Sequence, residues 1–242
     1  MLGEALSYPR RDDDWLRTLL IGGVLLALSP FVLPALVVQG YLVRVLRGVI
    51  GGEAEPPVFD EWVEMLIDGL KLIVIQFVYG LIPGALAFVG SLIAGFGAFA
   101  ASQGGRPAAG LGAGIGLFVG LIFLLVFLLA LLAAFLTPAA VANFAREDDL
   151  MAAFDFGTVR EVVTSRAYLV AVLYALAVGV VIAVVGVILS ITVVGVLLLV
   201  FVAFYGQVAI YYLVARGYTE ALGIDADAAR GATADVGSET NG

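Results

Sequence analysis

Four long stretches of the chain contain no Asp, Glu, Lys or Arg. They cover residues 18–43, 72–105, 107–145 and 167–215, which together make up more than half of the 242 residues. A helix needs only about 20 apolar residues to cross a bilayer core that is about 30 Å thick. Hydrophobic residues form 62% of the chain, against roughly 45–50% in a typical soluble protein. The sequence therefore predicts an all-α, polytopic transmembrane helix bundle.

The lengths of these stretches predict that they fold into helical hairpins. Residues 167–215 would be about 74 Å long as one helix, so we expect two crossings with a turn near Gly186–Gly195. A turn at Arg106 separates 72–105 from 107–145, and Pro83 and Pro138 are expected to kink the helices there. The first apolar segment is broken near Ser29-Pro30, because Pro30 would remove a hydrogen bond from a continuous helix. It forms either one kinked span or two short helices, which gives five to six apolar segments.

The positive charges predict which ends of the helices lie in the cytoplasm, because Lys and Arg are enriched in cytoplasmic loops. If the first segment is a hairpin, 11 cations lie on one side of the membrane and only Arg106 lies on the other. This favours three hairpins with both termini cytoplasmic. Five spans remain the alternative, since each half of the first hairpin has only about 14 residues. We expect one integral-membrane domain over 1–222 and a disordered acidic tail over 223–242.

Two polar segments precede the long hairpins. In the first, apolar residues recur at helical spacing and acidic residues fall on the other face, which indicates an amphipathic helix at the membrane interface with its acidic face in water. The acidic residues are Asp60, Glu61, Glu64 and Asp68. A shift of 95 residues aligns Phe59-Asp60 with Phe154-Asp155 and Lys71 with Arg166. This echo is either chance or a parallel structural repeat of the kind found in transporters.

The missing residue types exclude several functions. The chain has no Cys and no His, so it cannot form disulfides, His-based zinc sites or a Ser-His-Asp triad. GLGAGIG at 110–116 has the glycines of a nucleotide-binding loop but no preceding strand, and Glu147-Asp148-Asp149 is expected to be a solvated loop rather than a cation site. We predict no catalytic, cofactor-binding or metal-binding residues, no cofactor and no enzymatic activity.

The charge balance limits the partners. The chain has 12 Lys and Arg against 20 Asp and Glu, a net charge of −8. It is therefore a poor ligand for nucleic acid and has no polybasic stretch for anionic lipid. Its acid-rich composition, with Lys71 as the only lysine, resembles that of proteins from salt-loving archaea. The expected partners are the lipid bilayer, other membrane proteins or a second copy of the chain.

Polar and small residues within the spans suggest helix packing. Five polar residues are either interhelical hydrogen-bond partners or the lining of a substrate path: Gln39, Gln76, Thr137, Asn143 and Gln207. Two rows of glycines are expected to form faces for close packing, namely Gly80 with Gly84, and Gly112 with Gly116 and Gly120. Five tyrosines are expected in the interfacial belts: Tyr41, Tyr168, Tyr211, Tyr212 and Tyr218.

A series of short motifs resembles the DUF4013 family, an uncharacterised membrane family common in archaea. The motifs are Tyr8-Pro9 with Asp14-Trp15, Pro34 with Gly40-Tyr41-Leu42 and Arg44, Pro57 with Phe59-Asp60-Glu61-Trp62, Asp68-Gly69-Leu70-Lys71, Tyr79 with Pro83, and Ala152-Ala153-Phe154-Asp155-Phe156. The resemblance extends from Ala5 to about Leu222. It implies a multi-spanning membrane protein and brings no established activity, so no functional residue is carried over.

These observations lead to two functional hypotheses. The first is a non-enzymatic, structural or accessory component of the cell membrane. The alternative is a small-molecule permease or channel-like subunit, which the broken helices and the echo favour. Ion-coupled transporters usually keep Asp, Glu, His, Lys or Arg within the membrane. The four long apolar stretches contain none of these residues, which counts against ion-coupled transport.

Overall fold

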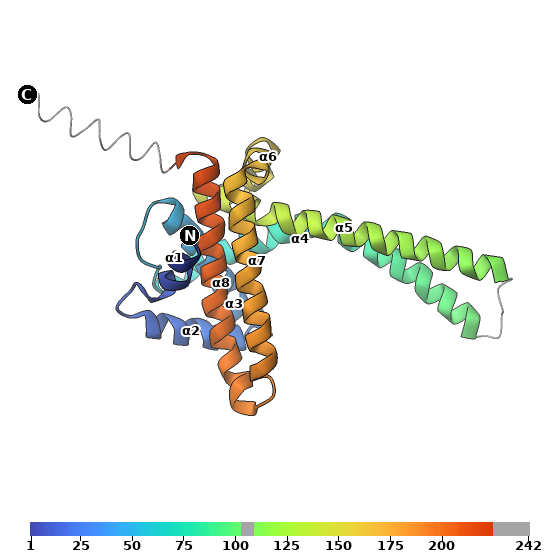
Figure 1. Cartoon of the computed structure of the whole chain (residues 1–242), viewed down its shortest axis with the longest axis horizontal. Helices are drawn as coiled ribbons and strands as arrows, with labels where there is room; N and C mark the ends of the chain where they lie inside the picture. The colour runs from blue at the N-terminus through green and yellow to red at the C-terminus, as the bar shows by residue number, and fades with distance from the viewer. Residues whose placement is uncertain (103–108, 225–242) are drawn as a thin grey trace, which may run out of the picture. The chain divides into compact units, whose positions relative to one another are not determined.

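The computed structural model describes residues 1–102 and 109–224 (Figure 1). The described residues form helices and no strands, which confirms the predicted all-α class. In chain order they are α1 (Leu2–Ser7), η1 (Tyr8–Arg10), α2 (Trp15–Ala27), α3 (Val32–Ile50), α4 (Trp62–Ser102), α5 (Ala109–Glu147), η2 (Leu150–Phe154), α6 (Phe156–Thr164), α7 (Arg166–Leu189) and α8 (Val193–Ala221). The turn expected at Arg106 and residues 225–242 of the tail expected over 223–242 lie outside the described residues.

Five of these helices are long and apolar enough to cross a membrane. They are α3, α4, α5, α7 and α8. The sixth apolar segment, α2, has 13 residues and is about 20 Å long, which is short of a bilayer core. The first apolar segment is therefore two helices, as one of the two sequence interpretations predicts, and the second of them reaches spanning length.

The breaks between helices follow from local backbone chemistry. Phe31 is extended between α2 and α3, next to Pro30, and Pro34 is tolerated because it lies in the first turn of α3. The turn from α7 to α8 lies where the sequence predicts it. There Thr192 accepts a hydrogen bond from the Gly195 amide at 2.9 Å, and a Cβ on Gly195 would overlap the Leu189 carbonyl.

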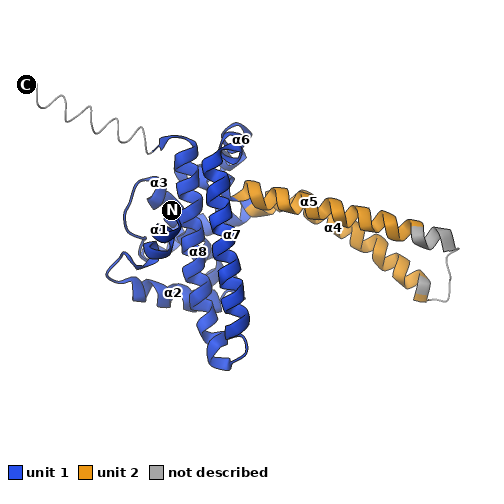
Figure 2. Cartoon of the chain, viewed as in Figure 1, with its two compact units in different colours: residues 1–75, 138–242 blue, residues 76–137 orange. Residues whose placement is uncertain are grey.

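The chain divides into two compact units, Met1–Ile75 with Pro138–Gly242, and Gln76–Thr137 (Figure 2). In the first, α8 packs against α1, η1, α2, α3, α6 and α7. Gly22 and Gly23 allow α2 to approach α8, because a Cβ on either would overlap Phe204 or Phe201. The second unit contains the central parts of α4 and α5, where Gly90 lies beside Ile122. Pro83 lies inside the continuous helix α4, and Pro138 lies inside the continuous helix α5.

The long helices expose their apolar side chains. Phe77, Phe96 and Phe127 of the second unit are 66%, 73% and 58% exposed, and on α7 Leu173 and Val180 are 64% and 62% exposed. A water-soluble protein rarely exposes so extended an apolar surface. Helices satisfy their own backbone hydrogen bonds and are therefore suited to a hydrocarbon solvent. The fold is that of a helical membrane protein.

Four of the five tyrosines expected at the interface lie in the core instead. Tyr41, Tyr168, Tyr212 and Tyr218 are 1%, 0%, 6% and 0% exposed. Tyr41 stacks on Phe59, with ring centroids 4.3 Å apart, and also contacts Phe204. The prediction of an interfacial belt is wrong for these residues because their rings fill the space between α3, α8 and the neighbouring segments.

Candidate functional site

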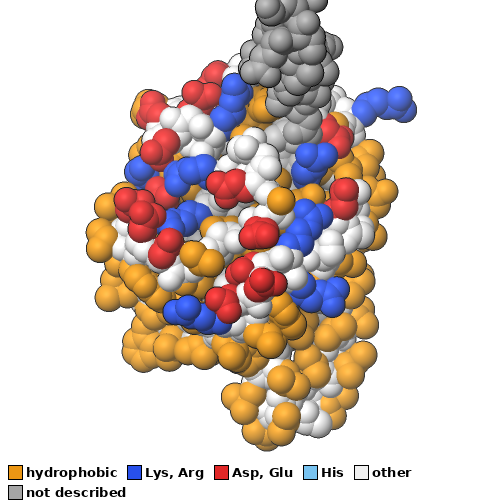
Figure 3. Space-filling model, turned by 90° about the vertical axis from the view of Figure 1, so that its left-hand side faces the viewer, with side chains coloured by type: hydrophobic (Ala, Val, Ile, Leu, Met, Phe, Trp, Pro, Cys, Tyr) orange, Lys and Arg blue, Asp and Glu red, His pale blue; other side chains and the backbone are white. Residues whose placement is uncertain are grey.

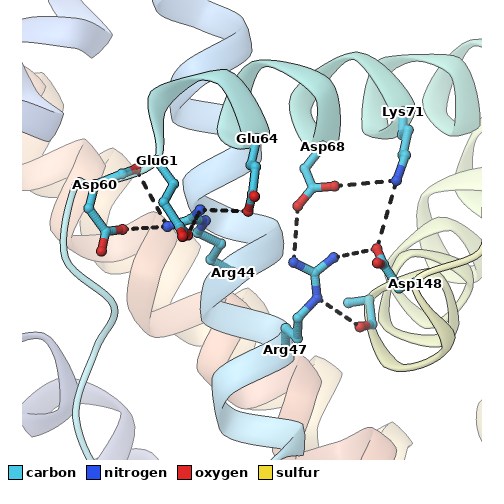
Figure 4. A network of polar contacts seen from close by, with 9 residues as sticks. Arg44, Arg47, Asp60, Glu61, Glu64, Asp68, Lys71 and Asp148 are labelled. Carbon is cyan, nitrogen blue, oxygen red and sulfur yellow. Dashed lines mark hydrogen bonds and ion pairs between the residues drawn. The ribbon is translucent and has the colours of Figure 1, made fainter.

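Two clusters of ion pairs join α3 to the beginning of α4 and the end of α5, all within the first unit (Figure 4). Both begin on α3, where Arg44 and Arg47 are three residues apart and share a face. The facing acids follow at similar spacing: Glu61 immediately precedes α4, and Glu64 and Asp68 lie within it. The sequence folds this way locally because complementary charges repeat once per helical turn on two adjacent helices.

A close approach of the two helix backbones brings these charges together. A Cβ on Gly40 of α3 would overlap the Met65 carbonyl of α4, and a Cβ on Gly69 would overlap the Leu36 carbonyl. Gly40 lies one turn before Arg44, and Gly69 directly follows Asp68. Only glycine permits this contact, so the two glycines set the separation at which the arginines reach the carboxylates.

The Arg44 cluster consists of Arg44, Asp60, Glu61 and Glu64. The guanidinium lies 2.5 Å from Asp60, 2.6 Å from Glu61 and 3.4 Å from Glu64. The Arg44 side chain is 11% exposed, whereas the three carboxylates are 58–67% exposed. Glu61 has a φ of 45°, a left-handed conformation that costs non-glycine residues roughly 1–2 kcal/mol. One arginine therefore fixes three acids at the start of α4.

The Arg47 cluster consists of Arg47, Asp68, Lys71 and Asp148. Arg47 lies 3.0 Å from Asp68 and 2.8 Å from Asp148, and its Nε donates to the Ala145 carbonyl at 3.3 Å. Lys71 lies 3.6 Å from Asp68 and 3.7 Å from Asp148. Asp148 has a φ of 53° just after α5. Two cations and two anions balance one another and join three helices.

The expected exposure of Asp68 is wrong. Its side chain is 7% exposed, because the acidic face of α4 packs on the arginines of α3 while the apolar face, with Val63 69% and Ile67 50% exposed, points outward. Asp148 of Glu147-Asp148-Asp149 is 68% exposed but ion-paired, so this segment is more than a solvated loop. Asp68 shares its cations with this exposed residue, which places the buried carboxylate at the polar end of the helices.

A buried hydrogen-bonded pair joins α5 to α8 at the same end. The Tyr218 hydroxyl donates to Asn143 Oδ1 at 2.6 Å, and Asn143 Nδ2 donates to the Ala152 carbonyl at 2.8 Å. Asn143 is thus an interhelical partner, as one sequence interpretation predicts. Thr137 donates instead to Ala133 within its own helix. The predicted glycine faces remain open, since nothing lies within 4 Å of a Cβ built on Gly80, Gly84, Gly116 or Gly120, and the side chain at position 112 lies outside the described residues.

The N-terminal leader also lies at this polar end. Tyr8 donates to the Glu55 carbonyl at 3.1 Å, and Arg11 donates to the Ala54 carbonyl at 3.3 Å. The ring of Tyr8 packs on Tyr212 of α8 with centroids 4.7 Å apart, and burial raises the pKa of Tyr8 above its ordinary value. The leader, the loop after α3, the end of α5 and the second half of α8 are therefore connected by direct contacts.

Figure 3 shows the resulting surface, on which acidic and basic side chains intermingle over the middle of one face and hydrophobic side chains lie around and below them. Each charged side chain of the two clusters has at least one ion-pair partner within its own cluster. Within residues 1–102 and 109–224 there is no group of three or more Asp and Glu side chains placed to hold a metal ion. The geometry of the two clusters supports helix–helix attachment.

A family model described as a protein of unknown function (DUF4013) matches residues 23–191. The chain belongs to this family. The DUF4013 match begins in α2 and ends in the turn before α8, so it contains every residue of the Arg44 and Arg47 clusters. No curated protein and no solved structure matches the chain.

Proposed function

We propose that this DUF4013 protein is a multi-pass component of the cell membrane that has a structural or accessory role and catalyses no reaction. The observation that carries the proposal is the division of its surface. The middle of α7 and the described part of the second unit present apolar side chains, while ion pairs gather at one end of the first unit. That arrangement suits helices whose charges hold the bundle together and whose remaining surface meets lipid or other helices.

The contacts at the polar end support a cytoplasmic location for both termini. The leader and the loop after α3 touch each other, so α2 and α3 leave and return to the same end. The Asn143–Tyr218 hydrogen bond brings the ends of α5 and α8 to one another. These cation-bearing segments share one side of the bundle, and the positive-inside rule assigns that side to the cytoplasm.

The partners that fit this surface are lipids, other membrane proteins or a second copy of the chain. Apolar helices associate in lipid where small residues allow their backbones to approach, and the open positions at Gly80, Gly84, Gly116 and Gly120 offer such places. The test is purification of the full chain in a mild detergent followed by chemical cross-linking. We expect cross-linked oligomers or co-purified membrane proteins that Gly84→Leu weakens. A strictly monomeric protein without partners contradicts the proposal.

A small-molecule permease or channel-like subunit is the second candidate. It is favoured by a hollow of about 600 Å³ beside Asn143, between the end of α5, η2 and α6. Gln207 does not line this hollow, and Gln76 belongs to the other unit. Solute flux into proteoliposomes distinguishes the two proposals: flux that Asn143→Leu abolishes would favour the permease, and flux equal to that of empty liposomes would favour the accessory role.

A further inference from the structure

The outer face of α6 carries exposed side chains that the two ion clusters do not use. Val159, Val162 and Val163 are 2%, 0% and 9% exposed, and α6 contacts α7 and α8. Phe156, the first residue of α6, is nevertheless 67% exposed. Arg160 follows one turn later and is also exposed, so the two side chains are neighbours on the helix. The valines dock the helix and leave an aromatic ring beside a guanidinium on the outside.

Arg160, together with Arg166 at the start of α7, lacks a carboxylate partner within the part of the chain that the structure describes. The cations of the Arg44 and Arg47 clusters, as well as Arg146, lie within 4 Å of an acid. The chain has 20 acidic residues for 12 basic ones, so a shortage of acids does not explain these two exposed arginines. Their guanidinium groups are free to bind an anion from outside the chain.

The acid at the start of α6 is already engaged. Asp155 accepts hydrogen bonds from the Gly157 amide at 3.0 Å and from the Thr158 hydroxyl at 2.7 Å. These bonds, that of the Thr158 hydroxyl first, hold the pKa of Asp155 below its ordinary value. The carboxylate caps α6 and leaves Arg160 unpaired.

Arg166 also fixes the level of this segment relative to a bilayer. It is the first residue of α7, and no ionisable residue except tyrosine follows it within that helix. A spanning helix begins at the level of the lipid headgroups, where arginine meets phosphate and an aromatic ring meets the upper acyl chains. Guanidinium groups bind phosphate oxygens through paired hydrogen bonds. The segment just before α7 therefore lies at the level of the lipid headgroups. It contains Phe156 and Arg160, and Arg166 follows as the first residue of α7.

We propose that Phe156 and Arg160 on the exposed part of α6, together with Arg166 at the start of α7, bind the phosphodiester headgroups of anionic phospholipids. The site needs no polybasic stretch, because two unpaired arginines and one ring supply the contacts. Arg10 and Arg17 of the leader are less suited, since Asp12, Asp13 and Asp14 lie between them and repel an anion. The inference rests on the proposed membrane location.

The test uses the full chain reconstituted into vesicles of phosphatidylglycerol and phosphatidylcholine in equal amounts. After extraction in mild detergent, the ratio of the two retained lipids is measured by native mass spectrometry. We expect the wild-type chain to retain phosphatidylglycerol preferentially and Arg160→Gln to lower that preference about fivefold, since one arginine near an anionic surface contributes roughly that factor. Arg166→Gln should act similarly. Glu161→Gln, on the same exposed part of α6, is the matched control and should not lower the preference.

Three results would overturn the inference. They are equal retention of both lipids by the wild type, an unchanged preference in Arg160→Gln, and displacement of the lipid by inorganic phosphate, which would identify a site for the free anion. Flotation of the vesicles separates this inference from the proposed function. A chain that does not float with vesicles contradicts the membrane role itself, whereas a chain that floats without lipid preference contradicts only the headgroup site.

Discussion

Arg47 Nη1 lies 3.0 Å from Asp68 Oδ2, and the aspartate side chain is 7% exposed. A buried carboxylate that loses its cation keeps the cost of its desolvation. Arg47 also reaches Asp148 and the Ala145 carbonyl. This single side chain therefore joins α3, α4 and the end of α5.

Arg47→Ala should lower the free energy of unfolding by about 2 kcal/mol. The loss is smaller than the 3–5 kcal/mol typical of a fully buried pair, because Arg47 is partly exposed and Lys71 still reaches Asp68. Thermal or detergent unfolding followed by circular dichroism measures it. Arg10→Ala, which removes an exposed arginine without an ion pair among the described residues, is the control. Equal stability of the two variants would show that the Arg47 cluster does not hold the helices.

Replacing both charged partners should restore part of that loss. In Arg47→Met with Asp68→Leu, no buried charge remains unpaired, and apolar side chains of similar size fill the space. We expect the double variant to be more stable than Arg47→Ala by at least about 1 kcal/mol. The loss of unfolding free energy in the double variant could instead equal the sum of the losses in Arg47→Met and Asp68→Leu alone. That result would refute a direct coupling between the two residues.

Gly40→Ala and Gly69→Ala should each separate α3 from α4. The added Cβ would overlap a backbone carbonyl of the facing helix, and overpacking of this kind costs about 1–3 kcal/mol. Gly179→Ala in α7 is the matched control, because nothing lies within 4 Å of its new Cβ and alanine is the better helix former. The close approach is disproved if all three substitutions have the same effect on the unfolding temperature.

Tyr218→Phe should lower the free energy of unfolding by about 1 kcal/mol, because it leaves the buried Asn143 Oδ1 without its hydroxyl donor. Tyr174→Phe, on a partly exposed ring of α7, serves as the control. The hydrogen bond predicts that Tyr218→Phe has little further effect in an Asn143→Ala background. Additive losses in this double-mutant cycle would argue against the pair.

The cap of α6 should depend on pH. The pKa of Asp155 is lowered in the folded chain by the Thr158 hydroxyl and by the amides of Gly157 and Thr158. The stabilisation is therefore complete above the ordinary aspartate pKa of about 3.9 and is lost as the pH falls through the lower folded value. Loss of the hydrogen bond from the Gly157 amide should therefore accelerate its exchange only at a pH below the ordinary aspartate pKa. Thr158→Val should move the transition to higher pH, and an unchanged profile in that variant would refute the hydroxyl contribution.

Local signals predict most of the helix pattern. Charge-free stretches identify the apolar helices, and the breaks at Ser29-Pro30 and at Ser190–Thr192 follow from residues that are adjacent in the sequence. It is harder to predict which face of each helix is buried. Asp68 lies on an acidic face that resembles a solvated one, and only the arginines of α3, more than 20 residues earlier, show that it is buried.

The close contacts of the bundle were also hidden in the sequence. Gly40 and Gly69 are single glycines, whereas the regular rows at Gly80 and Gly84 remain open. Asn143 and Tyr218 are 75 residues apart, and no periodic pattern connects them. A small residue one turn before an arginine, facing an Asp-Gly pair, is the signal that would have located the α3–α4 contact.

Labelling of single cysteines measures the membrane topology, and the chain contains no cysteine of its own that would give a background signal. Glu55→Cys lies in the loop after α3, and Ile191→Cys lies in the turn between α7 and α8, where the native side chain is 80% exposed. Intact cells are treated with a membrane-impermeant maleimide. With both termini in the cytoplasm, we expect Ile191→Cys to be labelled from outside and Glu55→Cys to be labelled only after the membrane is permeabilised. Labelling of Glu55→Cys in intact cells, or of both positions from the same side, would contradict this topology.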